Sequence, residues 1–148
     1  MKDKFRCDCP ITSALDILGD KWMLVLVKQM LMEDRATFKD FMESDEAIAT
    51  NILSTKLKLL EESKLVTKSK LPNNKKTNLY HLTEKGLALT PIILELALWS
   101  DGQLREVHPS ILNGEAMKSL RTDKAAFADV LVSRYREKLA SIAAMSKS

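Results

Sequence analysis

Residues Ile48 to Val66, IATNILSTKLKLLEESKLV, separate into two faces when the stretch is wound as a helix at about 100° per residue. Apolar side chains share one arc: Ala49, Ile52, Leu53, Leu57, Leu59 and Leu60. Short polar side chains and one central lysine share the opposite arc: Thr50, Asn51, Ser54, Thr55 and Lys58. Such a polar face can approach another surface closely, and the major groove of DNA is one such surface. On this stretch alone, an ordinary amphipathic helix with a solvated outer face explains the pattern equally well.

The sequence that follows this helix is basic and has the pattern of a β-hairpin. No acidic residue lies between Glu62 and Glu84, whereas lysines occur at Lys64, Lys68, Lys70, Lys75 and Lys76. VTKSKL (66–71) and TNLYHL (77–82) are typical of short strands, and the intervening PNNKK contains turn-forming residues. A polar-faced helix followed by a lysine-bearing hairpin is the layout of a winged helix-turn-helix, in which the helix enters the major groove and the hairpin follows the phosphates. The segment as a whole therefore favours DNA binding.

The chain upstream of this stretch is predicted to be helical. A charged tail covers residues 1–8, and Gly19 ends the first short helix. The second helix is apolar nearly all round, so we expect it to be central and buried, with Trp22 as a core anchor. The third carries Phe38 and Phe41 on one face, and a turn leads from it into the polar-faced helix, which completes a helix-turn-helix. The three predicted helices span residues 12–18, 21–32 and 35–43.

Lys56 is an exception on the polar-faced helix, because it falls at the centre of the apolar arc. Either its stem packs and its ammonium reaches solvent, or it pairs with an acid such as Asp40. In both cases Lys56 is not a simple phosphate contact.

Downstream of the hairpin, a long helix is predicted to begin in the LTEKG segment, with Thr83 as its N-cap, and to run to about Leu104 with a kink at Pro91. Its apolar cluster exceeds what one side of a small domain needs: Leu94, Leu96, Ala97, Leu98 and Trp99. Surplus apolar surface on a terminal helix indicates a partner, and a homodimer is the expected one. A larger intramolecular core is the alternative.

Pro109, Asn113 and Gly114 mark a boundary, and an amphipathic helix over 122–145 follows it. Its apolar side chains recur every three or four residues: Phe127, Leu131, Tyr135, Leu139 and Ile142. This helix either packs on the dimer, walls an effector cavity, or is a flexible appendage. The predicted organisation is a flexible tail (1–8), a winged helix-turn-helix domain with dimerisation helices (9–106) and a C-terminal helical extension (107–148).

Composition agrees with this fold class, a mainly α-helical protein with a small β-wing. The 148 residues suit one domain with an appended element, and 45% hydrophobic content supports a core. The net charge of +3 is mild, so the positions of the lysines carry the information. No apolar run approaches the ~18 residues of a membrane helix, and MKDKFRCDCP lacks an apolar signal core. We therefore expect a cytoplasmic protein without a membrane segment.

Several motifs occur in a specific order: Cys9-Pro10, GDKW (19–22), FKDF (38–41), the 48–66 stretch, YHLTEKG (80–86) and ALWS (97–100). On these motifs, roughly Cys9 to Trp99, the chain resembles HxlR-type transcriptional regulators, a winged-helix family related to the MarR-like regulators. The resemblance implies a bacterial homodimer that binds a pseudo-palindromic operator in double-stranded DNA. It also implies an interface built largely from the first and last helices of the domain, where Leu15, Leu18, Leu96 and Trp99 lie.

The resemblance further implies a recognition helix over Ala49–Ser63 and a wing over Val66–Leu82. Many members carry an arginine where this chain has Thr77, so Lys75 and Lys76 are expected to supply the phosphate contact, together with Lys68 and Lys70. Cys9 matches the cysteine that several members use as a sensor of electrophiles or oxidants. The alternative is a cysteine with no signalling role. Asp8 should raise the pKa of the Cys9 thiol, whereas Arg6 and Lys4 should lower it.

Other classes of function have weaker support. The candidate nucleophiles Cys7 and Cys9 have no histidine near them in the sequence, and the chain has no glycine-rich phosphate loop, HExxH motif or triad pattern, so we expect neither an enzyme nor a cofactor. A metal sensor using both cysteines and a histidine stays open, although structural zinc prefers wider spacing and four ligands. A winged helix that binds protein would not require an acid-free stretch over 63–83. A small-molecule effector is a further candidate partner.

Overall fold

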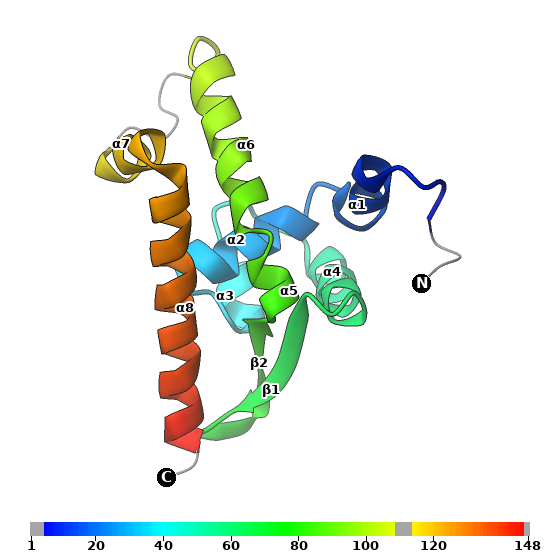
Figure 1. Cartoon of the computed structure of the whole chain (residues 1–148). Helices are drawn as coiled ribbons and strands as arrows, with labels where there is room; N and C mark the ends of the chain where they lie inside the picture. Colours follow the sequence, from blue (N-terminus) through cyan, green and yellow to red (C-terminus); the bar gives the residue numbers. More distant parts are fainter. Residues whose placement is uncertain (1–4, 109–113, 147–148) are drawn as a thin grey trace. The chain divides into compact units, whose positions relative to one another are not determined.

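The computed structural model describes residues 5–108 and 114–146, and the chain divides into two compact units, Met1–Thr83 and Glu84–Ser148. The first unit contains four helices and a two-stranded antiparallel sheet (Figure 1): α1 (Pro10–Leu18), α2 (Met23–Glu33), α3 (Phe38–Met42), α4 (Thr50–Glu62), β1 (Val66–Leu71) and β2 (Asn74–Leu82). The second unit is helical: α5 (Glu84–Leu87), α6 (Thr90–Gln103), α7 (Glu115–Thr122) and α8 (Lys124–Ser146). The predicted winged helix-turn-helix and the helical extension are confirmed.

Local hydrogen bonds explain where α1 ends and where α2 and α3 begin. Gly19 ends α1, where its amide donates to the Leu15 carbonyl at 2.7 Å, and a Cβ at this position would lie 2.3 Å from that oxygen. The Asp20 carboxylate then accepts the amides that open α2. Thr37 and Asp40 form a capping box, so α3 begins at Phe38 and is shorter than the predicted 35–43 helix.

The helix α2 is buried along most of its length, as its apolar composition predicted. Phe41 of α3 is also buried and meets the Tyr80 ring edge-on, with the ring centroids 6.3 Å apart. The Tyr80 amide donates to the Ala36 carbonyl at 2.8 Å, which ties β2 to the α2–α3 connection. Trp22 is only half-buried, and the Lys21 ammonium lies 5.0 Å from the centroid of its ring, so the expectation of a core anchor was wrong.

The wing differs from its prediction at the tip. The pairing runs regularly from Val66↔Leu82 to Lys70↔Asn78 and then shifts, because Leu71 pairs with Asn74. The turn consists of Pro72 and Asn73, and β2 begins at Asn74, three residues earlier than the predicted Thr77. Lys75 and Lys76 therefore lie in an irregular part of β2 and not in a loop. The Asn74 side chain accepts the Lys76 amide at 3.0 Å and stabilises this distortion.

The predicted 82–104 helix is two helices. Pro91 lies in the first turn of α6, where its missing amide costs nothing, so it begins a helix and does not kink one. The predicted 122–145 helix is confirmed as α8, whereas α7 was not predicted. The segment α7 precedes it, and extended backbone at Asp123 separates α7 from α8. The Asp123 carboxylate accepts the Ala126 amide at 3.0 Å and caps α8.

The core of the second unit is formed by Leu94 of α6 with Met117 and Leu120 of α7. Partly buried side chains surround it: Ala97, Leu98, Phe127, Ala128 and Leu131. Arg121 donates to the Asp101 carboxylate at 2.6 Å and Arg105 also binds it, and these guanidinium groups hold the pKa of Asp101 well below its usual range. The extension is thus packed on α6 and is not a flexible appendage in its described part. Pro109 and Asn113 lie outside the described residues, and Gly114 directly precedes α7.

Candidate nucleic-acid interface

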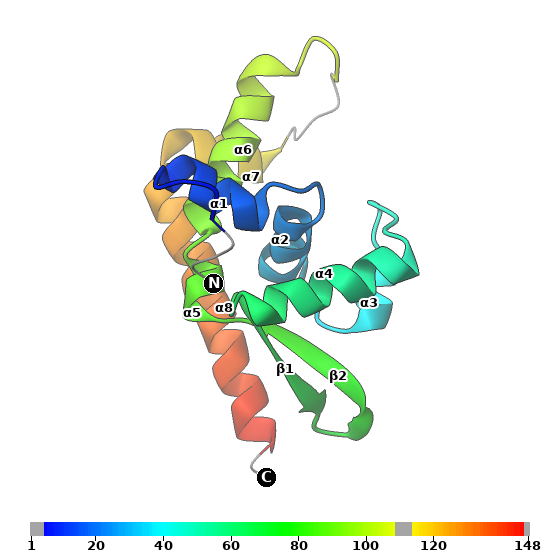
Figure 2. The ribbon, with the colours of Figure 1, turned by 90° about the vertical axis from the view of Figure 1, so that its right-hand side faces the viewer.

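The polar face of α4 is exposed to solvent. Leu53, Leu57 and Leu60 are buried on the opposite side, whereas Ala49 is exposed and Ile52 and Leu59 are half-buried, so the packed stripe is narrower than predicted. The exposed face contains the five predicted residues: Thr50, Asn51, Ser54, Thr55 and Lys58. Figure 2 shows α4 beside the wing within the first unit. A protruding helix of this kind can insert into a groove of DNA.

The side chains on this face differ in their freedom to contact a base. The Thr55 hydroxyl donates to the Asn51 carbonyl at 3.0 Å, and the Thr50 hydroxyl contacts the Met42 sulfur at 3.7 Å. Within the described residues, Asn51, Ser54 and Lys58 make no side-chain hydrogen bond or ion pair. Those three side chains therefore keep their full capacity for contacts with DNA.

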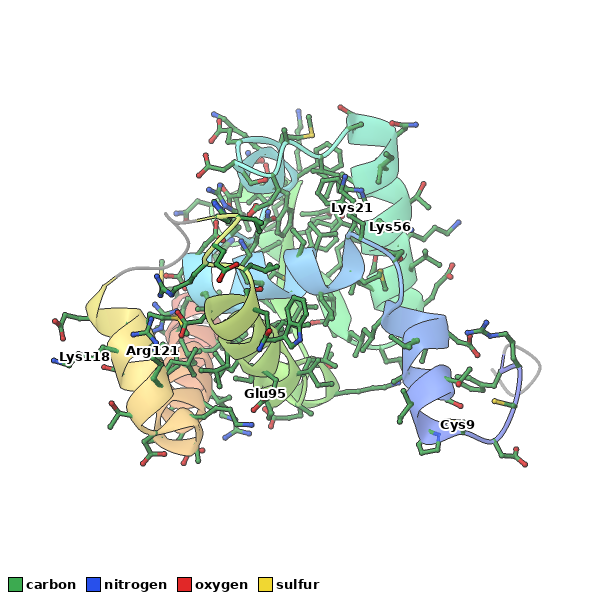
Figure 3. All side chains as sticks on the ribbon, turned by 90° about the horizontal axis from the view of Figure 1, so that it is seen from above. Cys9, Lys21, Lys56, Glu95, Lys118 and Arg121 are labelled. Carbon is green, nitrogen blue, oxygen red and sulfur yellow. The ribbon has the colours of Figure 1, made fainter. Side chains whose placement is uncertain are left out.

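Lys56, labelled in Figure 3, pairs with an acid, as one of the two predicted alternatives had it, but the acid is Asp20 and not Asp40. The Lys56 Nζ lies 3.1 Å from Asp20 Oδ2. Asp40 is occupied elsewhere, because its carboxylate accepts the amides of Ala36 and Thr37 within the capping box. The sequence correctly placed Lys56 on the packed side of the helix, but its partner lies 36 residues away and is visible only in the fold.

The four lysines of the wing also differ. Lys68 lies 3.7 Å from Glu61 of α4, and Lys70 donates to the Asn78 side chain at 2.7 Å. Lys75 and Lys76 are exposed, and no ion pair involves them in the described part of the chain. An open groove of about 480 Å³ lies between α4 and the wing, and its lining includes Ser54, Lys58, Lys68, Tyr80 and Phe38 of α3.

Cys9 is the N-cap of α1 and is exposed (Figure 3). The Thr12 amide and hydroxyl and the Ile11 amide stabilise its thiolate and lower the pKa of the Cys9 thiol. Neighbouring charges alone do not predict this effect, and the signal in the sequence is Pro10, which follows Cys9 directly and opens the helix. Arg6, expected to lower this pKa, instead binds Asp16 at 2.7 Å. Cys7 and Cys9 are both free.

The predicted dimer residues fall into two groups. Leu15 is 55% exposed, Leu96 51% and Trp99 60%, whereas Leu18 is buried within the chain. Ile92, which the sequence analysis did not select, joins Leu96 and Trp99 in an apolar groove along α6. Part of the apolar excess of this helix is covered within the chain, as the alternative of a larger intramolecular core predicted, because Leu94, Ala97 and Leu98 pack against α7 and α8.

Two further observations concern other kinds of site. No group of three or more His, Cys, Asp or Glu side chains within 5–108 and 114–146 is arranged to hold a metal ion. In the same ranges, no helix combines the length and the apolarity needed to cross a membrane.

A short helix, a turn, an exposed polar-faced helix and a lysine-bearing hairpin define a winged helix-turn-helix protein of the DNA-binding class. The sequence profile of the family described as HxlR-like helix-turn-helix matches residues 17–108, more than half of the chain. The chain belongs to this family of transcriptional regulators and is not an enzyme.

Two relatives illustrate the similarity. The HTH-type transcriptional regulator YodB of Bacillus subtilis (strain 168) is 34% identical over 94 residues, which cover 63% of this chain and 83% of YodB. An uncharacterized HTH-type regulator of Halalkalibacterium halodurans, BH0655, is 32% identical over 92 residues, which cover 62% of this chain and 81% of that protein.

Solved structures agree with this assignment. PA1607, a putative transcription factor, superposes with a TM-score of 0.61 at 28% identity, covering 68% of this chain and 69% of that one. The redox regulator HypR in its reduced form superposes with a TM-score of 0.58 at 26% identity, and the match covers 68% of this chain and 99% of HypR. Diamide-treated YodB of B. subtilis superposes with a TM-score of 0.50 at 34% identity, and the match covers 66% of this chain and 97% of YodB.

Proposed function

We propose that this regulator binds a pseudo-palindromic operator as a homodimer and that electrophiles or oxidants change its DNA affinity through Cys9. The observation that carries the proposal is the exposed face of α4, where Asn51, Ser54 and Lys58 have no partner within the described residues. Asparagine can bind adenine with two hydrogen bonds, and lysine can bind guanine or a phosphate. The exposed lysines Lys75 and Lys76 of the wing supply charge for the DNA backbone.

The homodimer is supported by the apolar groove on α6. Ile92, Leu96 and Trp99 expose large apolar surfaces on adjacent turns, and a second copy of the same helix would cover them in a two-fold symmetric interface. A symmetric dimer presents two recognition helices to half-sites one helical turn apart, about 34–36 Å. A pseudo-palindromic operator follows from that symmetry.

The thiol response is supported by the position of Cys9 and by the relatives. The exposed N-cap position favours the thiolate, which is the reactive form of cysteine. YodB has been solved in quinone-bound and diamide-treated forms, and HypR is described as a redox regulator. A quinone would add to the Cys9 sulfur. An oxidant such as diamide would take two electrons and two protons from two thiols, which leaves a disulfide between subunits through Cys7 or Cys9. The small-molecule effector would then be the electrophile itself.

Selection of bound duplexes from random DNA, followed by footprinting and sedimentation, tests the first part of the proposal. The expected result is one motif with two inverted half-sites, protected by a dimer. Enrichment of no motif, or protection by a monomer of a single half-site, would contradict it.

A further inference from the structure

Asp20 connects the beginning of α2 to the middle of α4. Its Oδ1 accepts the amides of Trp22 at 2.6 Å and Met23 at 3.0 Å, and its Oδ2 accepts the Lys56 ammonium at 3.1 Å. Both carboxylate oxygens are therefore engaged, one with the backbone of α2 and the other with a side chain of α4. Partial burial raises the pKa of Asp20, but the Trp22 amide and Lys56 outweigh it and keep that pKa below its usual value.

Apolar packing near this ion pair is incomplete. A cavity of about 160 Å³ lies beside it, lined by residues of α1, α2 and the last turn of α4, including Ile17, Met23, Leu59 and Glu62. Apolar packing is therefore incomplete between α1 and the C-terminal part of α4. The buried stripe of α4 is narrow. Hydrophobic contacts are non-directional, so such a stripe fixes the rotation of the helix about its axis only weakly. A charge-assisted hydrogen bond is directional and can set the rotation of α4 about its axis.

We propose that Asp20 and Lys56 are positioning residues for base recognition: their ion pair holds α4 in the rotation at which Asn51 and Ser54 reach the base edges. The inference rests on the proposed function, in which α4 enters the major groove. Hydrogen bonds to bases require donor–acceptor distances of about 2.7–3.2 Å and near-linear geometry, so a small rotation of the helix removes them. Contacts with phosphates by flexible lysines tolerate such a rotation. Loss of the pair should therefore lower sequence-specific binding more than binding to random DNA.

The variants that test this are Asp20→Asn, Lys56→Met and the double variant. The change Asp20→Asn keeps a side-chain oxygen that can cap α2 and removes the charge, and Lys56→Met keeps the apolar stem of the lysine. Lys39→Met and Glu43→Gln are matched controls, because Lys39 and Glu43 form an exposed ion pair outside α4. Thermal melts establish which variants are folded, and Lys56→Gln replaces Lys56→Met if the latter does not fold.

Each single variant should lower the ratio of operator to random-DNA affinity about tenfold, with an unchanged salt slope. The double variant should lose no more than either single variant, and Lys56→Arg should restore the ratio. A salt slope that is shallower by about one unit in Lys56→Met, with equal losses on both DNAs, would make Lys56 a phosphate contact and overturn the inference. Wild-type ratios in folded variants would also overturn it. If the wild-type protein binds no DNA at all, the proposed function itself is wrong. If the wild type binds its operator and the folded variants keep its affinity ratio, only the inference is wrong, so the two failures can be told apart.

Discussion

The Lys70 ammonium donates to the Asn78 side chain at 2.7 Å across the directly paired positions of the wing. This contact holds Lys70 against its own hairpin, and Lys68 is similarly directed toward Glu61. Lys75 and Lys76, by contrast, lie exposed on the irregular segment of β2. The four lysines of the wing, all predicted to contact phosphates, therefore differ in whether their ammonium groups already have a partner in the structure.

Replacing Lys75 and Lys76 together by Gln should weaken binding to operator and random DNA alike, because phosphate contacts carry no sequence information. The dependence of log affinity on log salt should become shallower by roughly one unit per lost contact. Binding measured by fluorescence anisotropy across a salt series checks this. Lys70→Gln is the control and should change the slope less. An unchanged slope in the double variant would mean that the wing tip does not touch DNA.

Asn51→Ala should weaken operator binding by about 1–3 kcal/mol and random-DNA binding much less, because Asn51 has a free amide on the exposed face of α4. Thr55→Ala is the comparison and should cost less, since the Thr55 hydroxyl already donates its hydrogen to the Asn51 carbonyl. Competition titrations with the selected operator measure both. Equal losses on the two DNAs would assign Asn51 to positioning instead of base recognition.

Leu96→Glu should convert the proposed homodimer into a folded monomer. Leu96 is exposed in the single chain, so the change should not disturb folding, whereas a glutamate buried in an interface without a partner costs several kcal/mol. Val130→Glu on α8 is the control, because Val130 is also an exposed apolar residue and lies outside the α6 groove. Sedimentation velocity distinguishes the outcomes. A Leu96→Glu dimer would place the interface elsewhere.

Cys9 should react with iodoacetamide with a lower pH midpoint in the folded protein than in the unfolded chain, because the Thr12 amide lowers the pKa of its thiol. A lowered pKa means more thiolate at neutral pH, and unfolding in urea should move the midpoint upward. Thr12→Ala removes the hydroxyl contribution and should slow alkylation of Cys9 at neutral pH. Mass spectrometry of time points measures the rates.

The same thiol should control DNA affinity. Diamide or a quinone should change operator binding in wild type and in Cys7→Ser but not in Cys9→Ser. An unchanged affinity in wild type, with the Cys9 adduct seen by mass spectrometry, would leave Cys9 without a signalling role.

Leu120→Ala should lower the free energy of unfolding by about 2–5 kcal/mol, because Leu120 is buried against Leu94 in the core of the second unit. Val130→Ala, at an exposed position of α8, should have little effect. Urea denaturation compares the two variants. Equal stabilities would show that the extension does not contribute to the fold in solution.

Local patterns account for what could be predicted from sequence. The alternation of polar and apolar residues in α4, the apolar composition of α2 and the strand–turn–strand pattern after Glu62 each depend on residues within about one or two turns of one another. The same local information correctly placed Lys56 on the packed side of α4. These features were sufficient for the fold class and for the exposed polar face of α4.

Tertiary structure decided the features that join distant residues. Lys56 pairs with Asp20 because the α1–α2 corner lies against α4. The Asp40 carboxylate instead accepts backbone amides at the start of its own helix. Leu94 and Leu96 are two residues apart, yet one faces the core with Leu120 and the other faces solvent, because α7 and α8 cover a single side of α6. Periodicity shows that a helix has apolar side chains, but only the packed neighbours determine which of those side chains remain available for a partner.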